Sequence, residues 1–215
     1  MAAEEVIEQL SQGVTAYAEQ GGSTDDLAIL FCGHSRGGAA ANIAAAYADE
    51  MADGLRPLAP RSSIYCYAFA VPRTTTTERA ADAMYDNIFN VLNPSDLVPR
   101  LPLATWGYAR YGRDLWLPAY GTEAFEAGYE EMRRRFLENV GVESPYDPTD
   151  VETVTDVEND LAEKVPTQAD FLSVGGVTAL AEALMQRMDV GRVLCGHYPN
   201  TYIAWMQSVS AAVLA

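Results

Sequence analysis

The sequence of 215 residues is poor in lysine, histidine and cysteine, and each shortage excludes a class of function. Only one of the 14 basic residues is a lysine, Lys164, against 30 acidic residues, so the formal net charge is −16. A surface this acidic repels phosphate backbones, which argues against nucleic acid as a partner. Two histidines are too few for a histidine-rich metal site. The three cysteines, Cys32, Cys66 and Cys195, form no CxxC pair and predict neither a disulfide framework nor a zinc site. We therefore expect no metal and no cofactor.

Long apolar runs are also missing from the chain. No stretch is long and apolar enough to predict a membrane span. The segment Met1–Gln9 is acidic and amphipathic, unlike the basic and apolar start of a signal peptide. The compartment therefore stays open: we expect a secreted protein if the parent gene encodes a leader upstream of Met1, and a cytoplasmic one otherwise. The hydrophobic content of 49% is enough for one domain with a packed core over residues 1–215.

Strand-like and helix-like segments alternate along the first half of the chain. Apolar runs of strand length predict buried strands, and apolar residues at helical spacing or runs of alanine predict helices. We expect strands at Leu27–Cys32, Ile64–Val71 and Asn87–Leu92, with helices at Glu5–Glu19, Ala39–Ala52 and Thr77–Tyr85. This alternation predicts the α/β class, with a mostly parallel central sheet and right-handed crossovers.

The second half of the chain predicts fewer strands. The alternating segment Tyr108–Leu117, which contains Gly112, suggests a short hairpin. Residues 121–170 are expected to form a helical or loop excursion, or a cap. Within them the acidic, proline-containing stretch Glu143–Pro166 predicts a solvated segment. Further helices are expected at Thr122–Val140, Phe171–Met188 and Tyr202–Leu214.

The motif that carries chemistry is G-x-S-x-G, formed by Gly33, His34, Ser35, Arg36 and Gly37 between a predicted strand and a predicted helix. In this context the serine sits on a strained turn, and the residues two positions away must be small so that strand and helix can approach. Ser35 is then the nucleophile at a helix N-terminus, where negative charge is favoured. The backbone N–H of Arg36 would form one half of an oxyanion hole.

A base must accept the proton of Ser35, and only two histidines exist. His34 adjoins the nucleophile on the same tight turn and is expected to point away from the hydroxyl. His197, expected on a loop before the last helix, is therefore the predicted general base, although a lone histidine is more often structural. Asp96, after the strand Asn87–Leu92, is the predicted orienting acid; its alternative role is that of a turn-forming residue after Pro94. The order Ser35, Asp96, His197 is that of the α/β-hydrolases.

Several stretches together resemble the class 3 lipases, the family of the fungal triacylglycerol lipases and their bacterial relatives. They are Phe31–Gly38, Tyr67–Arg73, Asn93–Pro102, Trp106–Tyr108 with Gly112–Leu117, and His197 followed by Tyr202 and Trp205. The resemblance implies a three-layer α/β-hydrolase sandwich and the roles given above for Ser35, Asp96 and His197. It also implies an ester or acyl-lipid substrate. Arg36 stands where the fungal enzymes usually have leucine, but only its backbone N–H is needed.

The chain departs from this family before the nucleophile. Family members carry several strands ahead of it, and a loop among them supplies the second oxyanion donor. Here only the helix Glu5–Glu19 precedes the predicted strand Leu27–Cys32. The sandwich is therefore expected to be incomplete on its N-terminal side. A second copy of the chain or an N-terminal partner segment would then cover the sheet edge, and a one-donor oxyanion hole would lower the rate on the order of 100-fold to 1000-fold.

Three functions fit these residues. The leading hypothesis is hydrolysis of carboxylic esters of acyl lipids through an acyl-enzyme. The second is a catalytically silent half-domain, which either needs an N-terminal segment for activity or serves as an interaction module. A peptidase or acyltransferase could use the same triad, but the resemblance argues against both.

Overall fold

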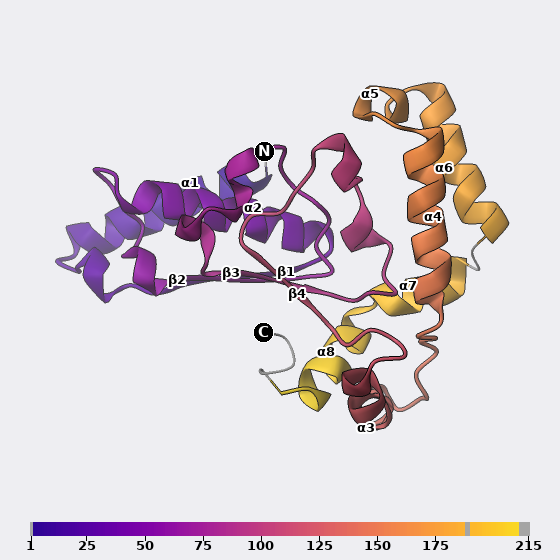
Figure 1. Cartoon of the computed structure of the whole chain (residues 1–215). Helices are drawn as coiled ribbons and strands as arrows, with labels where there is room; N and C mark the ends of the chain where they lie inside the picture. Colours follow the sequence, from indigo (N-terminus) through magenta and orange to yellow (C-terminus); the bar gives the residue numbers. More distant parts are fainter. Residues whose placement is uncertain (1, 188–189, 211–215) are drawn as a thin grey trace. The chain divides into compact units, whose positions relative to one another are not determined.

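The computed structural model describes residues 2–187 and 190–210 (Figure 1). The chain forms two compact units. We call the first unit Met1–Asn90 with Ala109–Asp114, and the second unit Val91–Tyr108 with Leu115–Ala215. The expectation of a single domain over residues 1–215 stays a prediction.

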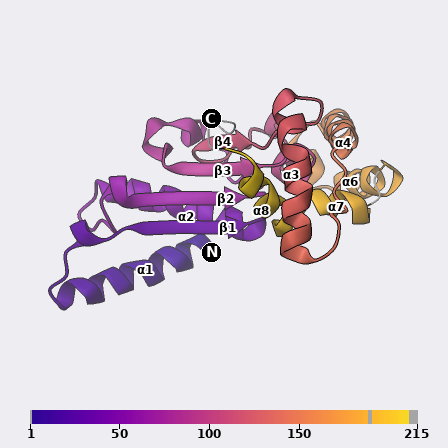
Figure 2. The same cartoon turned by 90° about the horizontal axis from the view of Figure 1, so that it is seen from below.

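Four strands form one sheet in the order β1-β2-β3-β4 (Figure 2). Their bounds are Ile29–His34 for β1, Ile64–Phe69 for β2, Ile88–Leu92 for β3 and Arg113–Trp116 for β4. Strand β1 pairs in parallel with β2, from Ile29 opposite Ile64 to His34 opposite Phe69. The predicted α/β class with a parallel sheet is therefore confirmed.

The faces of β1 and β2 differ from the prediction of strands buried on both sides. Side chains of β2 alternate: Ile64 is fully buried, whereas Tyr65 and Tyr67 are exposed. In β1, Leu30 is 64% exposed. The reason is that β1 is an edge strand, and that the two helices of the first unit lie on one side of the sheet (Figure 1). Successive side chains of a strand point to opposite faces, so only alternate residues meet those helices.

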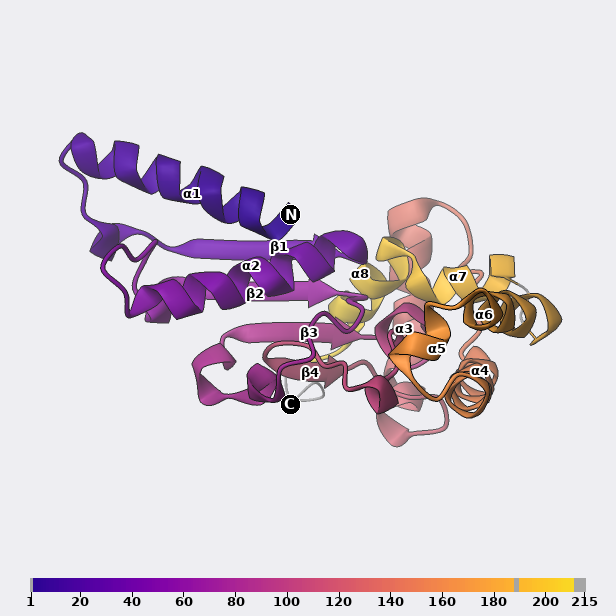
Figure 3. The same cartoon turned by 90° about the horizontal axis from the view of Figure 1, so that it is seen from above.

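The two helices of the first unit pack against the sheet differently. Helix α2 (Arg36–Ala52) buries Ala41, Ala44, Ala45 and Ala48, whose small side chains let it lie close to β1 and β2. Helix α1 (Ala2–Glu19) runs beside the outer edge of β1 (Figure 3). Its apolar stripe is only partly covered, since Val6 is 41% and Tyr17 38% exposed. A groove of about 870 Å³ follows this stripe and reaches Leu27, Ala28 and Ile29.

A buried polar network connects α2 to the middle of β3 and to residues just before and at the start of β4. The side-chain amide of Asn42 donates to Asn90 Oδ1 and to the carbonyl of Tyr111, both at 2.9 Å. Asn90 in turn donates to the same carbonyl and to Asp114. Because every buried amide here has partners, the network holds these segments in one register.

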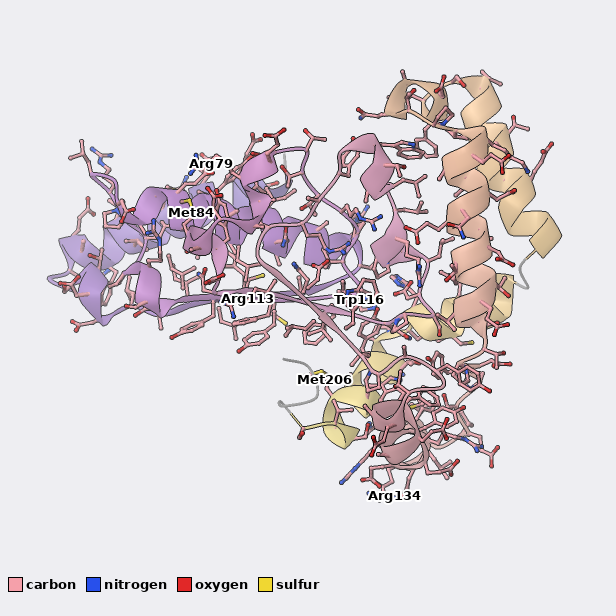
Figure 4. The ribbon with its side chains drawn as sticks, in the orientation of Figure 1. Arg79, Met84, Arg113, Trp116, Arg134 and Met206 are labelled. Atoms are coloured by element: carbon pink, nitrogen blue, oxygen red, sulfur yellow. The ribbon has the colours of Figure 1, made fainter. Side chains whose placement is uncertain are left out.

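Two expectations for the connecting segments were wrong. Thr77–Tyr85 forms two 3₁₀ turns rather than one helix, because Asp82 between them has extended backbone angles. There Arg79 pairs with Asp82 and contacts the sulfur of Met84 (Figure 4). The hairpin expected at Tyr108–Leu117 is instead the single strand β4. The 3₁₀ turns of the chain are Thr24–Asp26, Arg61–Ser63, Glu78–Ala81, Ala83–Tyr85, Val98–Arg100 and Ala104–Trp106.

The second unit is mainly helical. Its helices are α3 (Glu123–Val140), α4 (Asp150–Lys164), α5 (Gln168–Phe171), α6 (Val174–Arg187), α7 (Val190–His197) and α8 (Pro199–Ser208). Helices α3 and α8 pack closely, with the rings of Phe125 and Trp205 5.5 Å apart and Gly128 facing Trp205. On α3, Arg134 pairs with Glu131 and Glu138 (Figure 4).

Glu143–Pro166 differs from the solvated segment that its composition predicts. Helix α4 buries Val154, Val157 and Leu161 against Leu103 and Trp106. The indole of Trp106 also donates to the carbonyl of Val165 at 2.7 Å. Apart from the buried Asp150, the acidic residues of α4 lie on its more exposed faces, so the helix is amphipathic although its composition is mostly polar. Among the residues that the structure describes, no helix has the length and hydropathy of a membrane span.

Candidate active site

Ser35 lies at the turn between β1 and α2, in the first unit. Its backbone angles are φ 58° and ψ −125°, a conformation that is uncommon for a residue other than glycine and that typically marks strained functional positions. The backbone N–H of Ser35 donates to the carbonyl of Phe69 at the end of β2, at 2.9 Å. The side chain makes no capping bond to α2. This is the strand–turn–helix geometry in which G-x-S-x-G presents a serine.

The glycines of the turn are not equally constrained. A Cβ on Gly33 would lie 2.3 Å from the carbonyl oxygen of Gly37, so only glycine fits there. A Cβ on Gly38 would lie 3.0 Å from the carbonyl oxygen of Phe69. At Gly37 a Cβ meets no described atom within 4 Å. The close approach of strand and helix thus requires Gly33 and limits position 38, whereas position 37, which the motif predicts to be small, has space.

Arg36 is the first residue of α2. The backbone N–H groups of a first helical turn have no acceptor within the helix and point toward the N-terminal end, where the helix dipole is positive. The N–H of Arg36 lies in this first turn, and its role as an oxyanion donor stays a prediction.

Asp96 and His197 are in contact within the second unit, although they lie 101 positions apart in the sequence. Nδ1 of His197 lies 2.8 Å from Oδ2 of Asp96. Asp96 is 1% exposed, and the side chain of His197 is 15% exposed. An ionised carboxylate only accepts hydrogen bonds, so in this contact a neutral imidazole donates from Nδ1 and has Nε2 as its acceptor atom. This is the tautomer that a general base needs.

The remaining contacts of Asp96 complete its surroundings. Its Oδ1 accepts the backbone N–H of Val98 at 2.9 Å, and its Oδ2 accepts the hydroxyl of Tyr202 at 2.9 Å. Burial raises the pKa of Tyr202 well above its ordinary value, and the charge of Asp96 adds to this. The phenol therefore stays protonated and donates. The sequence contains Tyr202 in a family-like stretch, but no local signal reveals its role.

The predicted site residues fall into the two units. Asp96 and His197 are in contact within the second unit, whereas Ser35 belongs to the first unit, so the pairing of Ser35 with His197 stays a prediction. His197 is the last residue of α7 rather than a loop residue as expected. Helix α8 follows after Tyr198, with Pro199 at its first position. Within residues 2–187 and 190–210, no cluster of histidine, cysteine and carboxylate side chains could hold a metal ion.

Comparison with known proteins finds a family match in the first half of the chain. The model of the family "Lipase (class 3)" matches residues 1–106, which include Ser35 and Asp96 but not His197. No curated protein matches the chain. Solved structures that are similar include a lipase from Rhizopus microsporus var. chinensis (20% identity over 54% of this chain and 38% of that one, TM-score 0.41). They also include the triacylglyceride lipase of Rhizomucor miehei (21%, 51% and 39%, TM-score 0.40) and a triacylglycerol lipase whose catalytic centre is a serine protease triad (21%, 54% and 42%, TM-score 0.42).

The chain spans about 40% of the length of these solved lipases. The family match covers the segment from α1 to the turn at Trp106 and contains the whole strand–turn–helix unit around Ser35. On this match, residues 1–106 of the chain are similar to the class 3 lipase family.

Proposed function

We propose that this protein hydrolyses carboxylic esters of acyl lipids, with Ser35 as nucleophile, His197 as general base and Asp96 as the acid that orients it. The observation that carries the proposal is the 2.8 Å contact between His197 and the buried carboxylate of Asp96. A strained serine in a G-x-S-x-G turn supports it independently.

The proposed reaction runs through an acyl-enzyme. Ser35 Oγ attacks the ester carbonyl carbon while Nε2 of His197 takes the hydroxyl proton. The backbone N–H of Arg36 stabilises the oxyanion, and the Asp96 carboxylate stabilises the imidazolium. The alcohol leaves with the proton from His197. Water, activated by the same imidazole, then attacks the acyl-serine and releases the fatty acid.

The substrate class follows from the family and from the charge of the protein. Two of the similar structures are named as lipases of triacylglycerides or triacylglycerols. A formal net charge of −16 disfavours anionic headgroups, whereas it does not affect an uncharged ester. We therefore propose neutral acyl esters as substrates.

A fluorophosphonate probe and a short-chain p-nitrophenyl ester test the proposal. We expect labelling and turnover in the wild-type chain and their loss in Ser35→Ala. His197→Gln should lower turnover by about 1000-fold or more. The matched control is Ser62→Ala, which removes an exposed hydroxyl in another turn and should leave both signals unchanged. Labelling that persists in Ser35→Ala would refute Ser35 as the nucleophile.

A second candidate, a half-domain that is silent without a partner strand, is favoured by the edge of the sheet. Strand β1 is the edge strand, Leu30 on it is 64% exposed, and the groove of about 870 Å³ lies beside it. A second groove of about 300 Å³ is lined in part by Gly37, where a Cβ would contact no described atom within 4 Å. An added strand along β1 would pair its open backbone groups, in the manner of β-strand addition.

The oligomeric state and the probe reaction separate the two candidates. A dimer by light scattering, dissociated by Leu30→Lys, would identify a second copy as the partner. A monomer that the probe does not label, but that gains labelling when an N-terminal lipase segment is supplied, would identify the half-domain. A labelled, active monomer would exclude the second candidate.

A further inference from the structure

We infer that Asn93 is a positioning residue that holds the loop of Asp96 against the segment of His197. The inference rests on the proposed function for its catalytic meaning, but its contacts lie wholly within the second unit. Asn93 follows β3 directly and is fully buried. Nothing in the sequence assigns it a role, since an asparagine before a proline ordinarily serves only to begin a turn.

The side chain of Asn93 joins two segments that are 103 residues apart. Its Nδ2 donates to the carbonyl oxygen of Gly196 at 2.9 Å, one residue before His197. Its Oδ1 accepts the backbone N–H of Ser95 at 3.1 Å, one residue before Asp96. The carboxamide is therefore a direct bridge between the neighbours of the two residues whose 2.8 Å contact defines the site.

The backbone of Asn93 makes two further hydrogen bonds, to Asp96 and to Tyr202. Its carbonyl accepts the N–H of Asp96 at 3.0 Å, which closes the turn. Its N–H donates to the hydroxyl of Tyr202 at 3.0 Å, and this hydroxyl donates onward to Asp96. The phenol of Tyr202 is thus oriented by Asn93 and hydrogen-bonded to Asp96. Asn93 therefore positions both the turn that carries Asp96 and the Tyr202 hydroxyl that donates to the Asp96 carboxylate.

The bridge requires a short side chain with one donor and one acceptor, and glycine opposite it. Aspartate cannot donate to the carbonyl of Gly196, and serine is too short to reach it. A Cβ on Gly196 would lie 2.9 Å from the carbonyl oxygen of Ser95, so a larger residue would push the two segments apart. On the other side Tyr146 contacts Asn93 Oδ1 at 3.4 Å and Ser95 Oγ at 3.2 Å, which shields the bridge from water.

The test measures the His197 imidazole by NMR and does not require turnover. The chain has only two histidines, so His34→Gln and His197→Gln assign the ring signals. In the wild-type protein we expect one protected Nδ1–H and a single tautomer of His197. Asn93→Ser keeps an oxygen for the Ser95 N–H but loses the bridge to Gly196, and should speed exchange of the Nδ1–H about fivefold or more. Gly196→Ala should act in the same direction from the other side.

A control variant and the outcomes that would overturn the inference complete the test. Asn159→Ser, at an exposed position on α4, is the matched control and should leave the imidazole signals unchanged. An unchanged Nδ1–H in folded Asn93→Ser and Gly196→Ala would overturn the inference. A third variant, Asn93→Ala, also removes the oxygen that accepts the Ser95 N–H. A change seen in Asn93→Ala but in neither of the other two variants would overturn the inference too, because Asn93 would then act only through its own turn. If ester turnover is absent while the predicted exchange is seen, the bridge stands and the proposed function fails.

Discussion

The hydroxyl of Tyr202 donates to Oδ2 of Asp96, the same carboxylate oxygen that Nδ1 of His197 contacts, at 2.9 and 2.8 Å respectively. The oxygen therefore receives two hydrogen bonds from residues that lie five positions apart around the start of α8. A carboxylate held from two directions cannot rotate away from the imidazole, and this is the structural basis for the first prediction.

Tyr202→Phe should lower the turnover of a short-chain ester about fivefold to tenfold, as expected when one net hydrogen bond to a charged group is lost. Tyr198→Phe removes a phenol that is 45% exposed and is the matched control. Steady-state kinetics with both variants checks the prediction. Equal turnover in the two variants would show that the second donor to Asp96 is dispensable.

Position 33 should tolerate no side chain, whereas position 37 should. Gly33→Ala places a Cβ 2.3 Å from a backbone oxygen and is expected to destabilise the protein by about 1–3 kcal/mol or more. Gly37→Ala has space and should change the free energy of unfolding by less than about 1 kcal/mol. Urea denaturation of the two variants measures the difference. Equal stabilities would contradict the close approach of β1 and α2 at the turn.

The stability of the protein should contain a pH-dependent contribution from Asp49. This carboxyl is fully buried on α2; its Oδ1 accepts from Asn87 at 2.9 Å, while Oδ2 has no partner among the described residues. Burial raises its pKa from 3.8 to about 6. Because the folded state holds the proton more tightly than the unfolded state, this contribution is fully present below about pH 4 and is lost as the pH rises through 6.

Asp49→Asn removes the titration and tests this contribution. Relative to the wild type, the variant should gain stability between about pH 4 and pH 7, by at most roughly 3 kcal/mol. Urea denaturation at several pH values checks it, with Asp156→Asn at an exposed position as the control. A stability difference between Asp49→Asn and the wild type that does not change with pH would show that Asp49 titrates in the folded protein as it does in the unfolded chain.

Helix α4 should depend on the indole of Trp106. Trp106→Phe retains most of the apolar contact with Val154 and Leu161 but loses the hydrogen bond to the carbonyl of Val165, leaving a buried acceptor unpaired. We expect a loss of about 1–3 kcal/mol and faster proteolysis near Lys164. Limited proteolysis with a lysine-specific protease reports on this, since Lys164 is the one lysine of the chain. Unchanged cleavage would mean that α4 is held by its apolar face alone.

The sequence alone determined those elements that depend on residues a few positions apart. Gly33, Ser35 and the alanines of α2 predict a strained strand–turn–helix unit, because the fit of a Cβ and the propensity for helix depend on residues only a few positions away. The parallel sheet followed from the alternation of strands and helices. His197 was found by counting, since a chain with two histidines leaves little choice of base.

Only the tertiary structure decided what depends on residues distant in the sequence. The apolar sequence Leu27–Cys32 fits a central strand as well as an edge strand, so the exposure of Leu30 could not be predicted from it. The acidic residues of α4 predicted a solvated segment, and only the structure showed that Leu103 and Trp106 cover its apolar face. Asn93 and Tyr202 acquire their roles from partners about one hundred positions away, because a hydrogen bond depends on distance in space and not on distance along the chain.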